Sequence, residues 1–429
     1  MTASALTTRA AAALVAVLGV ATVAHAQAPQ APRAVTFEEA IARALERNPT
    51  VAIAATAIAR ADVLVRESRA SLMPYAEMRL NNVTLDSSRG FNGETFQPQN
   101  QFFFTPSVSV PILALWRRSI VEQARDQIEV ANRTVAEVRQ QVAVATAEAY
   151  LQVIAARRQL EIDESALKTA QAHLDYATRR LEGGIGSRLN QARAGQTVEI
   201  TLARIEAVRI LLRRAQEALG VMLAEDGPMD ARGEPVFERP GAISEADWVA
   251  ARPDLQLQAA VKRSSERVIR DAFKDWTPTA TASFAPTLVG PAGVFQPSQT
   301  WQLSFTVTQP LFKGGLKQNL DARLAAVSLT EATLTESRIR IEARSEIRMA
   351  QEALAGAERA EANARRAAEY AREVLKITTT AFEVGATTNI EVIEAQQDAR
   401  DSETAAALAE DATRRARLDL LVALGRFPK

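Results

Sequence analysis

The side chains that most often carry out chemistry are scarce in this chain of 429 residues. It has no cysteine and only two histidines, His25 and His173. The lack of cysteine excludes disulfides, iron–sulfur clusters, thiol nucleophiles and cysteine-bound zinc, and two histidines leave no room for a multi-histidine metal site. No serine–histidine pair, pair of catalytic acids or phosphate-binding loop can be found. We therefore expect no catalytic residues, no cofactor and no bound metal.

Two features could be mistaken for functional chemistry. The glycine cluster at residues 183–186 is no dinucleotide-binding loop, because such a loop follows a strand and this cluster follows a long helical pattern. It is predicted to be a turn. His173 lies among alanine and leucine within the same helical pattern, which indicates a packing or surface residue.

The composition points to long helices. Basic and acidic residues balance at 51 each, which argues against a nucleic-acid-binding protein. Apolar residues make up 47% of the chain but aromatic residues only 5%, so alanine, leucine, valine and isoleucine dominate.

Residues 1–26 have the pattern of a cleaved signal peptide. Arg9 precedes an apolar stretch, residues 10–23, that is shorter than the ~20 residues of a membrane-spanning helix. Ala24-His25-Ala26 then has the small–x–small pattern of a cleavage site. A weak membrane anchor is the alternative. The mature chain would begin with a flexible leader, residues 27–35, and no lipid anchor is expected because no cysteine is present.

The sequence after residue 35 consists of one unit that occurs twice. Asn48-Pro49 recurs as Arg252-Pro253, and Leu72-Met73-Pro74 recurs as Trp276-Thr277-Pro278, both 204 residues later. Further landmarks follow in the same order. They define repeat 1 at residues 36–225 and repeat 2 at residues 244–427, with a connector rich in glycine and proline at residues 226–243.

Each repeat predicts a short helix, a second helix, two strands and a long helical hairpin. Thr36 and Glu39 form a capping box at the first helix. Leucines at 160, 167, 174 and 181 recur every seven residues, which is typical of a coiled coil. The predicted strands lie at about residues 74–84, 101–110, 277–288 and 300–309, and the hairpins at residues 112–224 (tip 183–187) and 313–424 (tip 384–388).

The predicted strands have one apolar and one polar face. Residues 301–308 alternate without a fault, and each strand is close to the ~9–11 residues that cross a bilayer at a tilt. A soluble, half-buried sheet alternates in the same way and stays an alternative. Four strands cannot close a barrel, and open edges are unfavourable in lipid. Strands that cross a membrane would therefore require a ring of several chains.

The whole predicted mature chain resembles the TolC-type outer membrane factors, also called outer membrane efflux proteins. The resemblance rests on the entry motif at residues 36–49, the helix-to-strand junction Leu72-Met73-Pro74, residues 309–315, and the two hairpin tips with their return helices. It implies a mainly α protein with a small β part, in which duplicated coiled-coil hairpins and four strands per chain form a trimeric α-barrel tunnel joined to a 12-stranded outer membrane β-barrel.

The resemblance also implies partners. The protein would be a homotrimer in the lipid of the outer membrane, with a long periplasmic portion and no nucleic acid. Its tips would meet a periplasmic adaptor, or membrane fusion protein, that joins it to an inner-membrane pump of the RND, ABC or MFS type. It would be a passive duct for efflux or type I secretion, opened at tips formed by Gly184, Ile185, Gly186, Ser187, Val384, Gly385, Ala386 and Thr387.

Two acidic residues receive a specific role from the resemblance. Glu391 and Glu394 are three residues apart and so share one helix face. Carboxylates at the matching positions of family members ring the narrow end of the tunnel, where they attract cations. A solvated acidic face is the alternative from the residues alone.

The sequence departs from the best-known member of the family at the gate. There a tyrosine, an arginine and an aspartate tie the closed tips, whereas the matching positions here are Phe382, Thr387 and Asn190. Our hypothesis is that apolar and Asn/Thr contacts hold the resting state, or that it opens more easily.

The main alternative is a structural or adaptor coiled-coil protein of the periplasm with no pore. It would share the hairpins and the signal peptide but not the duplicated alternating strands.

Overall fold

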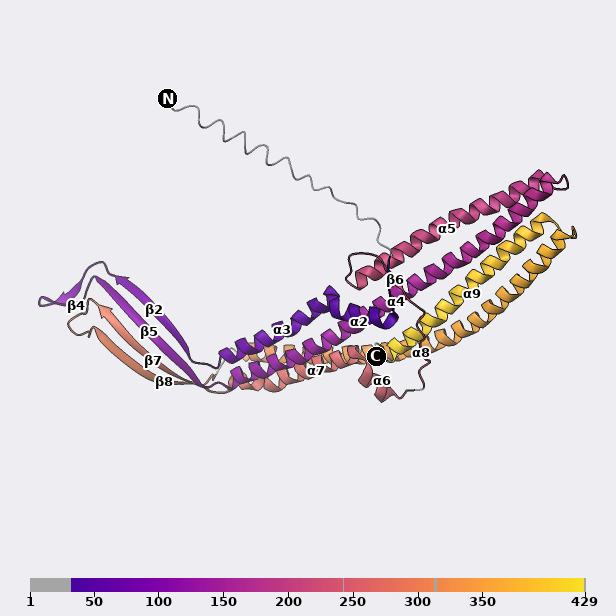
Figure 1. Cartoon of the computed structure of the whole chain (residues 1–429). Coiled ribbons are helices and arrows are strands. Elements are labelled where there is room, and N and C mark those ends of the chain that lie inside the picture. Colours follow the sequence, from indigo (N-terminus) through magenta and orange to yellow (C-terminus); the bar gives the residue numbers. More distant parts are fainter. Residues whose placement is uncertain (1–31, 242, 312–314, 428–429) are drawn as a thin grey trace, which may run out of the picture.

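The computed structural model describes residues 32–241, 243–311 and 315–427. The predicted signal peptide, His25 and residues 27–31 of the predicted leader lie outside these ranges. The chain is elongated, with a sheet at one end, two helical hairpin tips at the other, and short elements around the middle (Figure 1). Both halves of the chain contain the same order of main elements.

Several helices begin at residues whose side chains cap them. Thr36 accepts a hydrogen bond from the Glu39 N–H at 3.3 Å, and Ser244 accepts one from Asp247 at the same distance. The helices are α2 (Phe37–Arg47), α3 (Pro49–Ala70), α4 (Leu115–Glu182), α5 (Arg188–Met222), α6 (Glu245–Ala251), α7 (Pro253–Asp271), α8 (Gly315–Glu383) and α9 (Asn389–Ala423), with a short 3₁₀ turn at Ala272–Trp276.

Four antiparallel strands form the sheet in the order β2-β5-β7-β8. Their bounds are β2 (Tyr75–Thr84), β5 (Asn100–Leu113), β7 (Thr279–Gly290) and β8 (Gln299–Thr308). Among the described residues β2 and β8 each pair on one side only. Within the described ranges the sheet therefore ends in two strands whose outer backbone groups lack a partner strand.

The register divides the sheet into two chemically different faces. Phe104 pairs with Leu80 and Leu288, and Phe284 with Leu303, which places these side chains on one face. On the other face hydroxyl groups meet across strands, with Ser283 and Ser304 2.7 Å apart and Thr105 and Thr287 3.3 Å apart. One face is therefore almost wholly apolar and the other mostly polar.

Two short sheets differ from the prediction. The predicted loop between β2 and β5 contains a hairpin, β3 (Arg89–Phe91) and β4 (Glu94–Gln97), because Asn92 and Gly93 both adopt positive φ, as a two-residue hairpin turn requires. The predicted flexible leader is wrong for residues 33–35. They form β1 (Arg33–Val35), which pairs in parallel with β6 (Met229–Ala231) of the connector.

The largest core lies midway along the molecule and is organised around Tyr150 on α4. This side chain is fully buried. Its hydroxyl lies within 2.9–3.3 Å of the carbonyl oxygens of Val35, Arg232 and Gly233. Phe37 packs edge-on against its ring at 5.4 Å. Tyr150 thus fixes both β1 and the connector to the long helix.

Equivalent contacts join the shorter helices end to end in the two halves. The Asn48 amide donates to the Met222 carbonyl at the end of α5, and the Arg252 guanidinium donates to the Ala423 carbonyl at the end of α9, both at 3.0 Å. These bonds satisfy carbonyl groups that a helix end leaves free. Helices α3 and α5, and likewise α7 and α9, therefore meet end to end alongside α4 and α8.

Two glycines of α5 provide a matched test of this packing. A Cβ atom at Gly195 would meet only Leu174 Cδ1 at 4.0 Å, whereas one at Gly220 would lie 2.1 Å from the Gly227 carbonyl oxygen. We expect Gly195→Ala to stabilise the protein by about 0.5–1 kcal/mol, since alanine favours a helix. Gly220→Ala should instead destabilise it by about 1–3 kcal/mol through overpacking. Urea unfolding of both variants checks the opposite signs.

A helix that spans a membrane must be both long enough and apolar enough. Among the helices that the structure describes, no single helix meets both requirements. The pair α2 and α3, bent by 43° at their junction, meets them only when taken together.

Candidate functional site

The two hairpin tips lie beside each other and turn in the same way. Gly184 and Gly385 adopt positive φ values of 75° and 79°. The Ile185 N–H donates to the Arg180 carbonyl at 3.1 Å, and the Ala386 N–H donates to the Ala381 carbonyl at 2.7 Å. Glycine is favoured here because it adopts this left-handed conformation without strain. The return helices α5 and α9 then begin directly after the turns.

A cleft of about 380 Å³ lies between the tips. All three predicted gating residues, Asn190, Phe382 and Thr387, line it. Of the other predicted tip residues it is lined by Ile185, Gly186, Ser187 and Gly385, while Gly184, Val384 and Ala386 lie outside its lining. The cleft is also lined by Thr388, the last residue of the predicted tip 384–388. The lining residues that lie outside the predicted tips and gate are Ala177, Arg180, Arg193, Asn389 and Ile390.

Side chains of α4 fasten the first hairpin to the second at this cleft. His173 Nε2 and Asn389 Oδ1 are 2.8 Å apart, and the Tyr176 hydroxyl donates to the Glu383 carbonyl at 3.3 Å. The buried Phe382 ring lies 5.4 Å from His173 and 5.7 Å from Tyr176. The predicted gating residue Phe382 is therefore part of an aromatic contact between hairpins.

His173 is a packing residue that also bonds across the hairpins. Burial lowers the pKa of His173 from 6.5, although the hydrogen bond to Asn389 opposes the shift. A lowered pKa means that the unfolded chain binds the proton more readily. Stability from this contact is therefore complete above pH 6.5 and is lost as the pH falls through the lowered pKa.

We expect the tips to loosen on acidification for this reason. Hydrogen exchange of the backbone around residues 382–390 should accelerate as the pH falls below about 6.5, after correction for the intrinsic rate. The variant His173→Gln, which cannot take up a proton, should lose this dependence. Equal pH dependence in the variant and the natural chain would contradict the role of His173.

The two predicted selectivity residues lie at the start of α9. The Glu391 N–H donates to Thr388 Oγ1 at 3.4 Å, and the Thr388 hydroxyl donates to the Glu391 carboxylate at 3.2 Å. The Thr387 hydroxyl also donates to this carboxylate. Thr388 therefore caps the helix, and the Glu391 carboxylate bonds to hydroxyls at the tip. The Glu394 side chain is exposed and forms no hydrogen bond or ion pair with any described residue.

The match between the two repeats pointed to one cleft residue, Arg193, that was not predicted from the sequence. Arg193 follows Asn190 by three residues, as Glu394 follows Glu391, and each pair lies at the same distance from its tip glycine. Comparing the two repeats position by position would have selected Arg193. Arg180 carries no such signal, because only the packing of α4 against both tips places it here.

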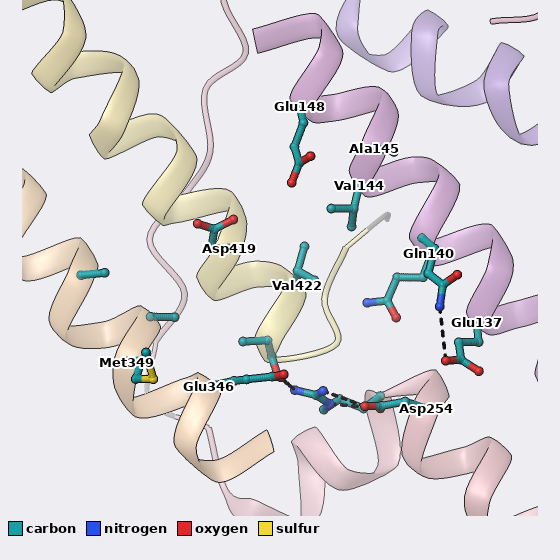
Figure 2. A pocket seen from close by; sticks show the side chains of 15 residues that line it. Glu137, Gln140, Val144, Ala145, Glu148, Asp254, Glu346, Met349, Asp419 and Val422 are labelled. Atoms are coloured by element: carbon teal, nitrogen blue, oxygen red, sulfur yellow. Dashed lines mark hydrogen bonds and ion pairs between the residues drawn. The ribbon is translucent and has the colours of Figure 1, made fainter. Parts of the chain in front are cut away.

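A larger cavity of about 770 Å³ lies midway along the helices, beside the junction of α7 and α9 (Figure 2). Arg252 bonds Asp254 and Glu346 at its floor. Burial, and then the charge of Asp254, raises the pKa of Glu137. Burial, and then the charge of Glu148, raises the pKa of Asp419, against the opposing charge of Arg415. In the part of the chain that the structure describes, no cluster of three or more His, Asp or Glu side chains could hold a metal ion.

Comparisons with known proteins give the same fold for solved outer membrane channels. The outer membrane channel CmeC of Campylobacter jejuni superposes with a TM-score of 0.78 at 17% identity, covering 91% of this chain and 85% of that one. A membrane protein of Pseudomonas aeruginosa gives 0.79 at 19% identity, with 90% and 93% covered. The fold class predicted from the resemblance, long helices with a few strands, is confirmed.

Sequence comparisons identify the family. Nodulation protein T of Rhizobium leguminosarum bv. viciae is 23% identical over 391 residues, which is 87% of this chain and 78% of that protein. The family model for outer membrane efflux proteins matches residues 40–225 and again residues 246–426. The chain therefore belongs to the outer membrane efflux protein family.

Proposed function

We propose that this outer membrane efflux protein is the passive, trimeric exit duct of a tripartite efflux or type I secretion system. A periplasmic adaptor would join it to an inner-membrane pump of the RND, ABC or MFS type. The observation that carries the proposal is the two-faced sheet with two open edges. The family match favours this reading over a coiled-coil protein without a pore.

The sheet has the chemistry of one segment of a membrane barrel. Its apolar face would contact lipid and its hydroxyl-rich face would line the lumen. The unpaired outer backbone groups of β2 and β8 would be costly in lipid unless they bond to each other in neighbouring chains. Three chains would supply twelve strands, and each β8 would pair with the β2 of the next chain.

The helical wall has matching free edges. Next to the sheet, four helices lie side by side. From the β2 edge their order is α3, α4, α7, α8. On α8, the outermost helix, a row of large apolar side chains is exposed. On α3, at the opposite edge, Ile53 and Val63 are exposed. Contact between α8 of one chain and α3 of the next would bury both sets and close the tunnel. The exposed α8 residues are Leu320, Leu324, Val327, Leu334 and Ile341.

At the narrow end we propose that Glu391 and Glu394 form a ring that selects cations. Three chains would bring six carboxylates together, and a narrow constriction strengthens their field. The tips would open when an adaptor loosens the contacts around Asn190, Phe382 and Thr387.

Planar-bilayer recording of the purified protein tests both the proposed duct and the proposed selectivity ring. We expect stable channels, and we expect Glu391→Gln with Glu394→Gln to lower the cation-to-anion permeability ratio by about threefold or more. The matched control is Glu238→Gln with Glu245→Gln, which removes the same charge near the middle of the chain. An absence of channels would contradict the duct itself, whereas channels with an unchanged ratio would contradict only the selectivity ring.

A further inference from the structure

The cleft between the tips contains two positive charges without acidic partners. Arg180 and Arg193 both line it. The Arg180 guanidinium lies over the rings of Phe382 and Tyr176, at 5.7 and 5.8 Å, and it forms no ion pair with any described residue. The Arg193 guanidinium bonds to no described side chain. Among the residues that the structure describes, no Asp or Glu lines the cleft.

Other groups around the cleft also favour an anion. Asn389 is only 4% exposed, and its amide nitrogen has no hydrogen-bond partner in the described part of the chain, although the side chain lines the cleft. Helices α5 and α9 both begin here, so the positive ends of two 35-residue helix dipoles meet at the same place. The nearby Glu391 carboxylate is already bonded by the hydroxyls of Thr387 and Thr388.

We infer that this cleft binds an acidic side chain, Asp or Glu, presented by the tip of the partner adaptor. The inference rests on the proposed function, since it names the chemistry of the adaptor that the duct would meet. A carboxylate can accept from a guanidinium in a bidentate manner, which gives geometry as well as charge. Binding would neutralise charges that the free tips leave unpaired.

The rim of the cleft adds a second requirement for the partner. Ile185 is 73% exposed and Ile390 is 44% exposed, and both lie at the cleft. A fitting partner would therefore carry its acidic residue among aliphatic neighbours on a narrow helical tip, which would cover these side chains while the carboxylate enters between them.

The test uses a photoreactive residue in place of Ile185 in cells, followed by mass mapping of the captured adaptor. Because the Arg193 side chain bonds to nothing in the described chain, Arg193→Glu replaces one of the two positive charges of the cleft by a negative one without removing a structural contact. We expect it to reduce adaptor capture about tenfold or more. Replacing the mapped acidic residue of the adaptor by lysine should restore capture. Arg188→Gln, an exposed arginine of the same tip outside the cleft lining, should change capture less than about twofold.

The outcomes separate the inference from the proposed function. A mapped adaptor segment without Asp or Glu, or full capture by Arg193→Glu, would overturn the acidic contact and leave the duct intact. Capture of no adaptor by the natural tip in cells with active efflux would instead contradict adaptor docking at the tips, and the acidic contact with it.

Discussion

Phe305→Arg is expected to abolish nearly all stable assembly in the outer membrane. Phe305 is 70% exposed on the apolar face of β8, which the proposed barrel turns toward lipid. An arginine on a lipid-facing strand position costs about 2–4 kcal/mol near the bilayer midplane, and three chains would each incur this cost. The measurement is the amount of heat-resistant oligomer in outer membrane fractions.

The neighbouring residue provides the control for this prediction. Thr306 lies on the opposite, polar face of the same strand, so Thr306→Arg would place its charge in the lumen. We expect near-normal assembly of this variant. Equal assembly of both variants would mean that the two faces of the sheet do not meet lipid and water as proposed.

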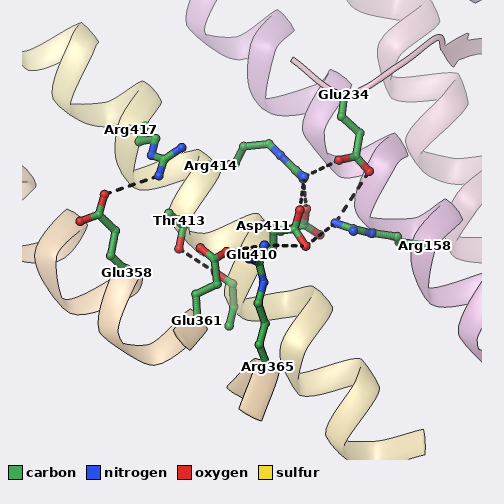
Figure 3. A network of polar contacts seen from close by, with 11 residues as sticks. Arg158, Glu234, Glu358, Glu361, Arg365, Glu410, Asp411, Thr413, Arg414 and Arg417 are labelled. Atoms are coloured by element: carbon green, nitrogen blue, oxygen red, sulfur yellow. Dashed lines mark hydrogen bonds and ion pairs between the residues drawn. The ribbon is translucent and has the colours of Figure 1, made fainter. Parts of the chain in front are cut away.

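Arg414→Met is expected to destabilise the helical wall by about 3–5 kcal/mol, because it leaves a buried carboxylate unpaired. Arg414 is nearly buried on α9 and bonds Asp411 at 2.6 Å, Glu410 at 2.8 Å and Glu234 of the connector (Figure 3). Burial already raises the pKa of Asp411, against the opposing charge of Arg414. Urea unfolding followed by the helical circular dichroism signal measures the loss.

A matched arginine lies one turn further along α9. Arg417 pairs with Glu358 at 3.5 Å, and both side chains are about one-third exposed, so Arg417→Met should cost less than about 1 kcal/mol. Adding Asp411→Asn to Arg414→Met should recover part of the loss, since it removes the unpaired charge. Similar losses for Arg414→Met and Arg417→Met would contradict the importance of burial.

Much of the fold could be predicted because long elements carry repeated signals. The 68-residue helix α4 and the strand β8 show their periods over many residues, so their bounds were close to those observed. The strand β1 has three residues and pairs with a segment almost two hundred residues away. The structure of β1 depends on its contacts with Tyr150 and with the connector. The sequence around residues 33–35 gives no sign of these distant contacts. The Asn92-Gly93 turn did carry a local signal, which the sequence analysis missed.

The residues of the candidate site also fall into those with a local sequence signal and those that depend on distant contacts. Glycines predicted the tips, because turn chemistry is local. The resemblance to the family selected Glu391 and Glu394, through their spacing from Gly385. The roles of His173 and Arg180 depend on α4 passing beside the second tip. These contacts join residues of different repeats. Only the three-dimensional packing brings them together.

The absence of cysteine makes one measurement especially direct. Single cysteines placed on β2 at Met78 or Leu80 can be combined with single cysteines on β8 at Leu303 or Phe305, and then oxidised in membranes. The proposed ring predicts that at least one β2–β8 combination gives a covalent ladder that ends at three chains, while each single-cysteine variant stays uncrosslinked. A ladder ending at two chains, or crosslinking by β2 cysteines alone, would contradict a closed trimer built by joining β8 to β2.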